Sequence, residues 1–215
     1  MWILLWVILS VVLLGSALWS LQILMRQKKA WEAYAKKKGL VFNKGTFMGA
    51  AEINGVIGNY KIAFFTAERQ EADVRRRRYV TSVEITLSEG LVNGGVAGTQ
   101  NVLTFMQSLG KLHPYPIDGW QPTQYMFVLH DDVIKAYLTP DRLETFDNIL
   151  KTRNSDTVIV FSDQEMAIRL ETSDPMQDAD KMDKVITRIL GLADKLRITP
   201  EQRAQYMALA PKTDA

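Results

Sequence analysis

MWILLWVILSVVLLGSALWSLQILM occupies residues 1–25 and contains no charged side chain. An α-helix rises about 1.5 Å per residue, so this stretch is long enough to cross a hydrocarbon core of about 30 Å with some tilt. A cleaved secretory signal is the alternative, but no basic residue precedes the apolar run and no A-x-A-like site directly follows it. The run also exceeds the roughly 7–15 apolar residues of a signal. We therefore predict a retained transmembrane helix.

A strongly basic segment follows the apolar run. Residues 26–38 carry six basic side chains and one acidic side chain. Basic residues beside a span stay on the cytoplasmic side, because their translocation is unfavourable and anionic lipid head groups attract them. The sequence therefore predicts an N-terminus outside the membrane and a cytoplasmic domain. The side chains expected at the membrane surface are Arg26, Lys28, Lys29, Lys36, Lys37 and Lys38.

The composition of the rest of the chain excludes several classes of function. The chain has no cysteine, so disulfides, thiolate metal ligands and a cysteine nucleophile are absent. Outside the basic segment, 20 basic and 23 acidic residues leave a net charge of −3. Because nucleic-acid binding requires a concentrated basic face, we expect no nucleic-acid partner. The approximately 177 residues that begin at Gly39 are enough for one domain with its own core.

The patterning of this segment predicts an α+β fold with a mainly antiparallel sheet. Short runs of β-branched and apolar residues predict strands at 40–42, 51–57, 60–66, 79–87, 125–130, 133–138, 157–161 and 167–171. Gly58-Asn59 predicts a tight hairpin turn between two of them. We interpret the glycine-rich residues 90–98 as a loop and residues 112–124 as irregular.

Helices are predicted from caps and apolar spacing. Residues 100–109 have helical spacing, Thr139-Pro140 begins a second helix, and Asp174-Pro175 begins a long one that ends near residue 197. A capping box that begins at Thr199 starts the last helix. The predicted organisation is a transmembrane helix at 1–25, a basic juxtamembrane helix at 26–38, a cytoplasmic α+β domain at 39–198, and a short helix with a tail at 199–215.

One part of the chain resembles known domains. The motifs are Trp31-x-x-x-Ala35, Gly39-Leu40-x-Phe42, Ile53-x-Gly55 and Gly58-x-Tyr60-x-Ile62, followed by a strand entered through arginine. Together, residues 31–85 resemble the opening of small uncharacterised bacterial domains that occur beside membrane segments. The resemblance implies a helix followed by a β-meander, and a location in a bacterial inner membrane. It implies no activity.

Three further features are candidate chemical sites. The glycines between 93 and 98 lack the Lys-Ser/Thr of a P-loop and depart from G-x-G-x-x-G, so we interpret them as a connector. His113 and His130 have no convergent ligands or nucleophile in the sequence pattern, so we interpret both as structural. Arg75, Arg76, Arg77 and Arg78 are either a solvated hairpin end or a contact for an anion or an acidic partner.

Two main classes of function remain, and a third is a lipid-surface regulator that acts through the two basic clusters. The leading hypothesis is a single-pass interaction protein that serves as an accessory, assembly or scaffold subunit of an inner-membrane complex. Its partners would be membrane lipids and other membrane proteins, and we predict no catalytic, metal or cofactor site. The alternative is a membrane-tethered enzyme or small-ligand sensor whose site is assembled from scattered residues.

Overall fold

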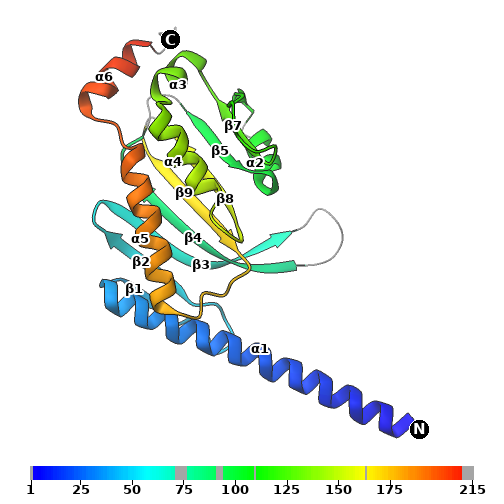
Figure 1. Cartoon of the computed structure of the whole chain (residues 1–215). Helices are drawn as coiled ribbons and strands as arrows, with labels where there is room; N and C mark the ends of the chain where they lie inside the picture. The colour runs from blue at the N-terminus through cyan, green and yellow to red at the C-terminus, as the bar shows by residue number, and fades with distance from the viewer. Residues whose placement is uncertain (1, 71–76, 91–93, 109, 163, 210–215) are drawn as a thin grey trace.

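The computed structural model describes residues 2–70, 77–90, 94–108, 110–162 and 164–209. One sheet forms the middle of the domain, α4 and α5 lie side by side on one of its faces, and α1 passes beneath and extends away from it (Figure 1). The predicted α+β fold class is therefore confirmed.

The helices differ greatly in length. Their bounds are α1 Trp2–Lys38, α2 Leu103–Ser108, α3 Asp131–Tyr137, α4 Pro140–Leu150, α5 Ala179–Leu196 and α6 Pro200–Leu209, and a 3-10 turn η1 spans Gln100–Val102. The transmembrane segment 1–25 and the basic segment 26–38, for which the sequence allows either a continuation of the first helix or a separate surface helix, form one continuous helix from Trp2 to Lys38.

Nine strands among the described residues form a single antiparallel sheet. Their bounds are β1 Val41–Asn43, β2 Glu52–Ile57, β3 Tyr60–Gln70, β4 Arg77–Leu87, β5 Gly95–Thr99, β6 His113–Pro114, β7 Gln124–Val128, β8 Ser155–Phe161 and β9 Met166–Thr172. The order across the sheet is β1-β2-β3-β4-β9-β8-β5-β7-β6. The predicted hairpin between β2 and β3 is present, and β8 and β9 form another antiparallel pair.

The C-terminal half of α1 is part of the domain core. Gly39 has a φ of +69°, which ends the helix, and Leu40 N donates to Ala35 O at 2.9 Å to close the last turn. Trp31 and Tyr34 are fully buried, and their rings lie 5.8 and 5.5 Å from the ring of Phe64 on β3. This aromatic cluster fixes the helix against the sheet.

The loop predicted for the glycine-rich residues 90–98 is wrong over its second half, because residues 95–99 form β5 between β7 and β8. A Cβ on Gly95 would collide with the ring of Phe161, and a Cβ on Gly98 would lie 2.6 Å from Val102 Cγ2. The glycines therefore allow close packing inside a sheet. Residues 91–93 lie outside the described part of the chain.

The strand predicted at 133–138 is also wrong, since Asp131–Tyr137 form α3. Val133, Ile134 and Tyr137 are buried on one side of it, which is the i, i+1, i+4 spacing of a helix. Asp131 and Asp132 occupy its first turn, where acidic side chains favour the helix dipole.

The long helix α5 begins later than predicted. Its cap is Asp178, whose carboxylate accepts from the backbone N–H groups of Asp180 and Lys181. The predicted cap Asp174 instead accepts from Met176 N at 2.8 Å. Met176 has a φ of +51°, a left-handed conformation that prevents the helix from starting there.

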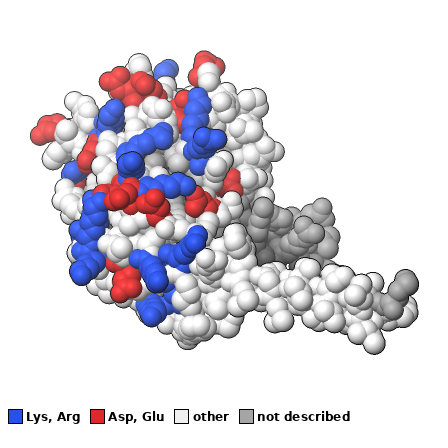
Figure 2. Space-filling model, turned by 60° about the horizontal axis from the view of Figure 1, so that its bottom comes forward, with Lys and Arg blue, Asp and Glu red and all other residues white. Residues whose placement is uncertain are grey.

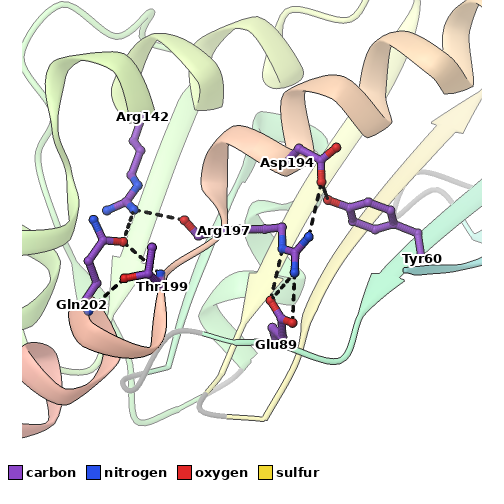
Figure 3. Close-up of polar contacts among 7 residues, drawn as sticks. All are labelled: Tyr60, Glu89, Arg142, Asp194, Arg197, Thr199 and Gln202. Atoms are coloured by element: carbon purple, nitrogen blue, oxygen red, sulfur yellow. Dashed lines mark hydrogen bonds and ion pairs between the residues drawn. The ribbon is translucent and has the colours of Figure 1, made fainter. Parts of the chain in front are cut away.

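A polar network attaches α6 at the end of the domain opposite α1 (Figure 3). The buried guanidinium of Arg142 donates to Tyr137 O, Arg197 O, Gln202 Oε1 and Tyr206 Oη at 3.0–3.1 Å. Thr199 and Gln202 form the predicted capping box through reciprocal hydrogen bonds of 3.1 and 3.3 Å. The side chain of Arg197 in turn pairs with Glu89 at 2.9 Å.

Candidate functional site at the base of helix α1

Helix α1 has a free half and a packed half. Every residue from Trp2 to Ser20 is exposed and uncharged, and burial begins at Leu21. The free half, residues 2–20, is about 28 Å long at 1.5 Å per residue, close to the thickness of a hydrocarbon core. The helix is long and apolar enough to cross a membrane. Figure 2 shows the free half as an uncharged rod beside a domain that carries many charges.

The domain begins where the free half ends. Gln177 Nε2 donates to the backbone oxygen of Ile23 at 3.5 Å, so the segment before α5 touches α1 three residues after Ser20. The N-terminal end of α5 and the exit of α1 therefore lie at the same end of the domain (Figure 1). A membrane crossed by the free half would leave the domain against its surface without a linker.

The six basic residues predicted at the membrane surface have different environments. Lys28 is only 3% exposed, and its ammonium group donates to Thr46 O at 2.6 Å and to Phe47 O at 3.3 Å. Lys37 and Lys38 pair with acids of α5. Exposed positions are occupied by Arg26, Lys29 and Lys36. Arg26, Lys29 and Lys36 therefore keep exposed side chains, and the side chain of Lys37 is partly exposed beside its acidic partners.

The ion pairs between α1 and α5 hold the two helices together. Asp183 pairs with Lys38 at 2.6 Å and with Lys37 at 3.0 Å, and Asp180 pairs with Lys37 at 3.0 Å. The hydrogen bond from Lys38 is the largest influence that lowers the pKa of Asp183, and the bonds to Asp180 and Asp183 raise the pKa of Lys37. These partly exposed contacts orient the helices and contribute modestly to stability.

Only the second half of the arginine run lies within the described residues, since Arg75 and Arg76 fall outside them. Arg77 and Arg78 begin β4, where they pair in register with Gln70 and Arg69 of β3. These two positions therefore stand near the end of a hairpin that projects beyond the rest of the sheet, toward the same side as the free half of α1 (Figure 1).

Both histidines lie at the start of α3. His113 Nε2 lies 2.7 Å from Asp131 Oδ1 in an exposed pair, and His130 occupies the N-cap position of α3 without a capping hydrogen bond from its side chain. Within the described ranges, no group of three or more His, Cys, Asp or Glu side chains could hold a metal ion.

A cavity of about 320 Å³ lies between α5 and the sheet. Its walls are mainly apolar, and exposed basic side chains stand at its rim. Apolar wall residues are Val83, Leu170, Met176, Met182, Val185 and Ile186, and the basic residues are Arg153, Lys181 and Arg188. Lys181 is paired with Asp174. No local signal in the sequence predicts this cavity, because its lining comes from separate elements of the chain.

The turn held by Lys28 was also missed. Gly49 N donates to Thr46 O at 3.2 Å, which closes a turn with Phe47 and Met48 at its tip. Gly45 and Gly49, which flank the turn, are the signal that was present in the sequence. Nothing local in the sequence, however, connects this turn to a lysine 18 residues earlier.

Comparison with known proteins gives a fold likeness. No family model matches the chain, and no curated protein matches it. A crystal structure of the mycobacterial trehalose monomycolate transport factor A, TtfA, is similar with a TM-score of 0.50 and 8% sequence identity. The similarity covers 79% of this chain and 93% of that chain. At this identity, the likeness concerns the arrangement of the backbone alone.

Proposed function

We propose that this protein is a single-pass, membrane-anchored accessory subunit of a bacterial inner-membrane complex, with its α+β domain in the cytoplasm. The basic residues that follow the apolar run support this orientation, since positive charge is retained on the cytoplasmic side. Its role is to assemble or scaffold other membrane proteins, and the partners are membrane lipids and those proteins.

The observation that carries the proposal is the continuity of α1. The same helix that supplies the apolar free half also supplies Trp31 and Tyr34 to the core. A domain joined in this way is held at a fixed height and orientation at the bilayer, which raises its effective concentration near other membrane proteins.

The fold likeness supports an accessory role in a limited way. The similar structure is that of a protein named as a transport factor. We carry over only this general role, and we take neither its substrate nor its partners, because a likeness at 8% identity shows the fold alone.

Two experiments test the proposal. A reporter that is active only in the cytoplasm, fused after Ala215, should be active, and a reporter that needs the periplasm should be silent there. Solubilisation of native membranes in a mild detergent should recover the full chain together with a membrane protein. The reverse reporter pattern would overturn the orientation, and recovery of the chain by itself would overturn the accessory role.

A second candidate function, a tethered small-ligand sensor, is favoured by the cavity beside α5. Apolar walls with a basic rim suit an anionic amphiphile, and about 320 Å³ lies within the range of ligand pockets. Dodecyl phosphate, titrated onto the full chain in nanodiscs, should shift the NMR methyl signals of Met176 and Met182. The exposed Met207 supplies the matched control signal. Equal shifts at all three methionines would refute a cavity site.

A further inference from the structure

The turn at Thr46–Gly49 exposes two large apolar side chains. Phe47 is 67% exposed and Met48 is 76% exposed. Both occupy the central positions of the turn closed by Gly49 N and Thr46 O. A phenylalanine and a methionine at the tip of a short loop leave apolar surface in water unless something covers it.

The conformation of the turn is fixed from inside the protein. The ammonium group of Lys28 donates hydrogen bonds to the carbonyl oxygens of Thr46 and Phe47, so these oxygens face the protein and the side chains of Phe47 and Met48 point outward. Asn43 Oδ1 accepts from Gly45 N at 3.1 Å, and Gly45 adopts a φ of +63°. Burial of a lysine is costly unless its charge is satisfied by hydrogen bonds, and here those bonds also support the turn.

The support also determines where the turn lies. Side chains of an α-helix tilt toward its N-terminus, so the ammonium group of Lys28 reaches back along α1 toward Met25 and the exit of the helix. The turn is therefore held beside the residues of α1 that directly follow the free half. Exposed basic residues lie in the same two segments, namely Lys44 just before the turn and Arg26 and Lys29 on either side of Lys28 in the sequence of α1.

We propose that the Thr46–Gly49 turn is a membrane-interface wedge, whose Phe47 and Met48 enter the boundary between head groups and acyl chains of the leaflet from which α1 emerges. This inference rests on the proposed membrane anchoring of α1. The occupant of the apolar surface is lipid, because Lys28 holds the turn close to the exit of the apolar free half, and the exposed basic residues Arg26, Lys29 and Lys44 suit anionic head groups. The wedge gives the domain a second attachment point and fixes its tilt.

The chain contains no cysteine, so single-cysteine labelling has no background. Three full-length variants, Met48→Cys, Met207→Cys and Val12→Cys, are labelled with an environment-sensitive fluorophore and reconstituted into vesicles of phosphatidylglycerol and phosphatidylethanolamine. Met207 is the matched control, since it is the same residue type, is 62% exposed and lies on α6, far from α1 (Figure 1). Val12 reports insertion of the free half.

Interfacial side chains lie about 5–10 Å into the boundary, so lipids brominated near the head group should quench the label at position 48 at least about twofold more than the label at position 207. Lipids brominated deep in the acyl chain should quench the label at position 12. If position 12 is quenched while position 48 behaves like position 207, the wedge is wrong and the anchoring stands. If position 12 is not quenched, the anchoring and the wedge both fail. If position 48 is shielded in native membranes but not in these vesicles, the occupant is a protein and the lipid proposal is overturned.

Discussion

Replacing Trp31 with alanine tests whether the packed half of α1 belongs to the domain. The indole is fully buried, and its ring meets the ring of Phe64 at an angle of 64° and a distance of 5.8 Å. Truncation of a buried aromatic residue to alanine costs about 3–5 kcal/mol, because transfer free energy is lost and a cavity remains. A domain of ordinary stability has about 5–15 kcal/mol in total, so one substitution removes a large fraction of it.

The assay is urea unfolding of a fragment that begins at Leu21, which lacks the free half and keeps the packed half. With a slope of about 2 kcal/mol per molar urea, Trp31→Ala should lower the unfolding midpoint by about 1.5–2.5 M. Glu32→Ala is the matched control, since Glu32 is the next residue and is exposed. Its midpoint should stay within about 0.25 M of the parent, as for surface substitutions generally.

A second fragment sharpens the test. A chain that begins at Gly39 lacks both Trp31 and Tyr34, so it should fail to give a cooperative unfolding transition. The reasoning is refuted if this shorter fragment unfolds at the same midpoint as the longer one. It is also refuted if Trp31→Ala lowers the midpoint no more than Glu32→Ala does.

Four further outcomes are expected. Arg142→Ala should destabilise the domain by about 3–5 kcal/mol in denaturant unfolding, because it leaves buried carbonyl acceptors without a donor and detaches α6. Gly95→Ala should cost about 1–3 kcal/mol through its clash with a buried ring, whereas Gly191→Ala, with open space around it, should be neutral or slightly stabilising. The pKa of Asp183 is lowered in the folded chain, so its ionised carboxylate stabilises the fold above about pH 4. This stabilisation is lost as the pH falls through the lowered pKa. Asp183→Asn should therefore remove this part of the acid dependence of unfolding. Two alanines inserted after Ser20 should rotate the domain relative to the free half by about 200° about the helix axis, whereas four alanines should rotate it by about 40°. Co-purification of a membrane partner should therefore be weaker with two inserted alanines than with four.

Features that depend on local signals were predicted correctly from the sequence. The apolar helix follows from an absence of charge, the hairpin at Gly58 follows from turn chemistry, and the starts of α4 and α6 follow from a hydroxyl cap before a proline. Each signal lies within a few residues of the structure that it determines, so tertiary packing has little opportunity to override it.

Features that depend on distant neighbours were not predictable. Residue 95 is a glycine within a strand because the ring of Phe161, 66 residues later in the chain, leaves no space for a side chain there. Helix α5 is capped by Asp178 rather than by Asp174 because Met176 adopts a left-handed conformation. Short apolar runs such as residues 133–138 fit both a strand and a helix. The helix forms here because it buries the apolar side chains on one side against the rest of the domain.

The candidate site combines both kinds of signal. The position of the span and its basic flank could be predicted, since both are properties of composition. The different environments of the basic residues in that flank could not be predicted, because the role of Lys28 depends on two carbonyl oxygens from a turn that follows β1. A lysine that the sequence predicts as a lipid contact is thereby a buried support for apolar side chains.

The absence of a linker after the free half makes the orientation of the domain a property of the fold. A flexible linker would let the domain rotate and tilt, so any of its faces could meet the membrane. Here α1 crosses directly into the core, and Gln177 contacts it at Ile23, three residues beyond the free half. If the free half crosses a membrane, the base of α5 faces the bilayer, while α6 and its Arg142 network stand at the opposite end (Figure 1). In that arrangement, a soluble partner reaches the distal end and the sides of the sheet, whereas a membrane-embedded partner meets the free half of α1.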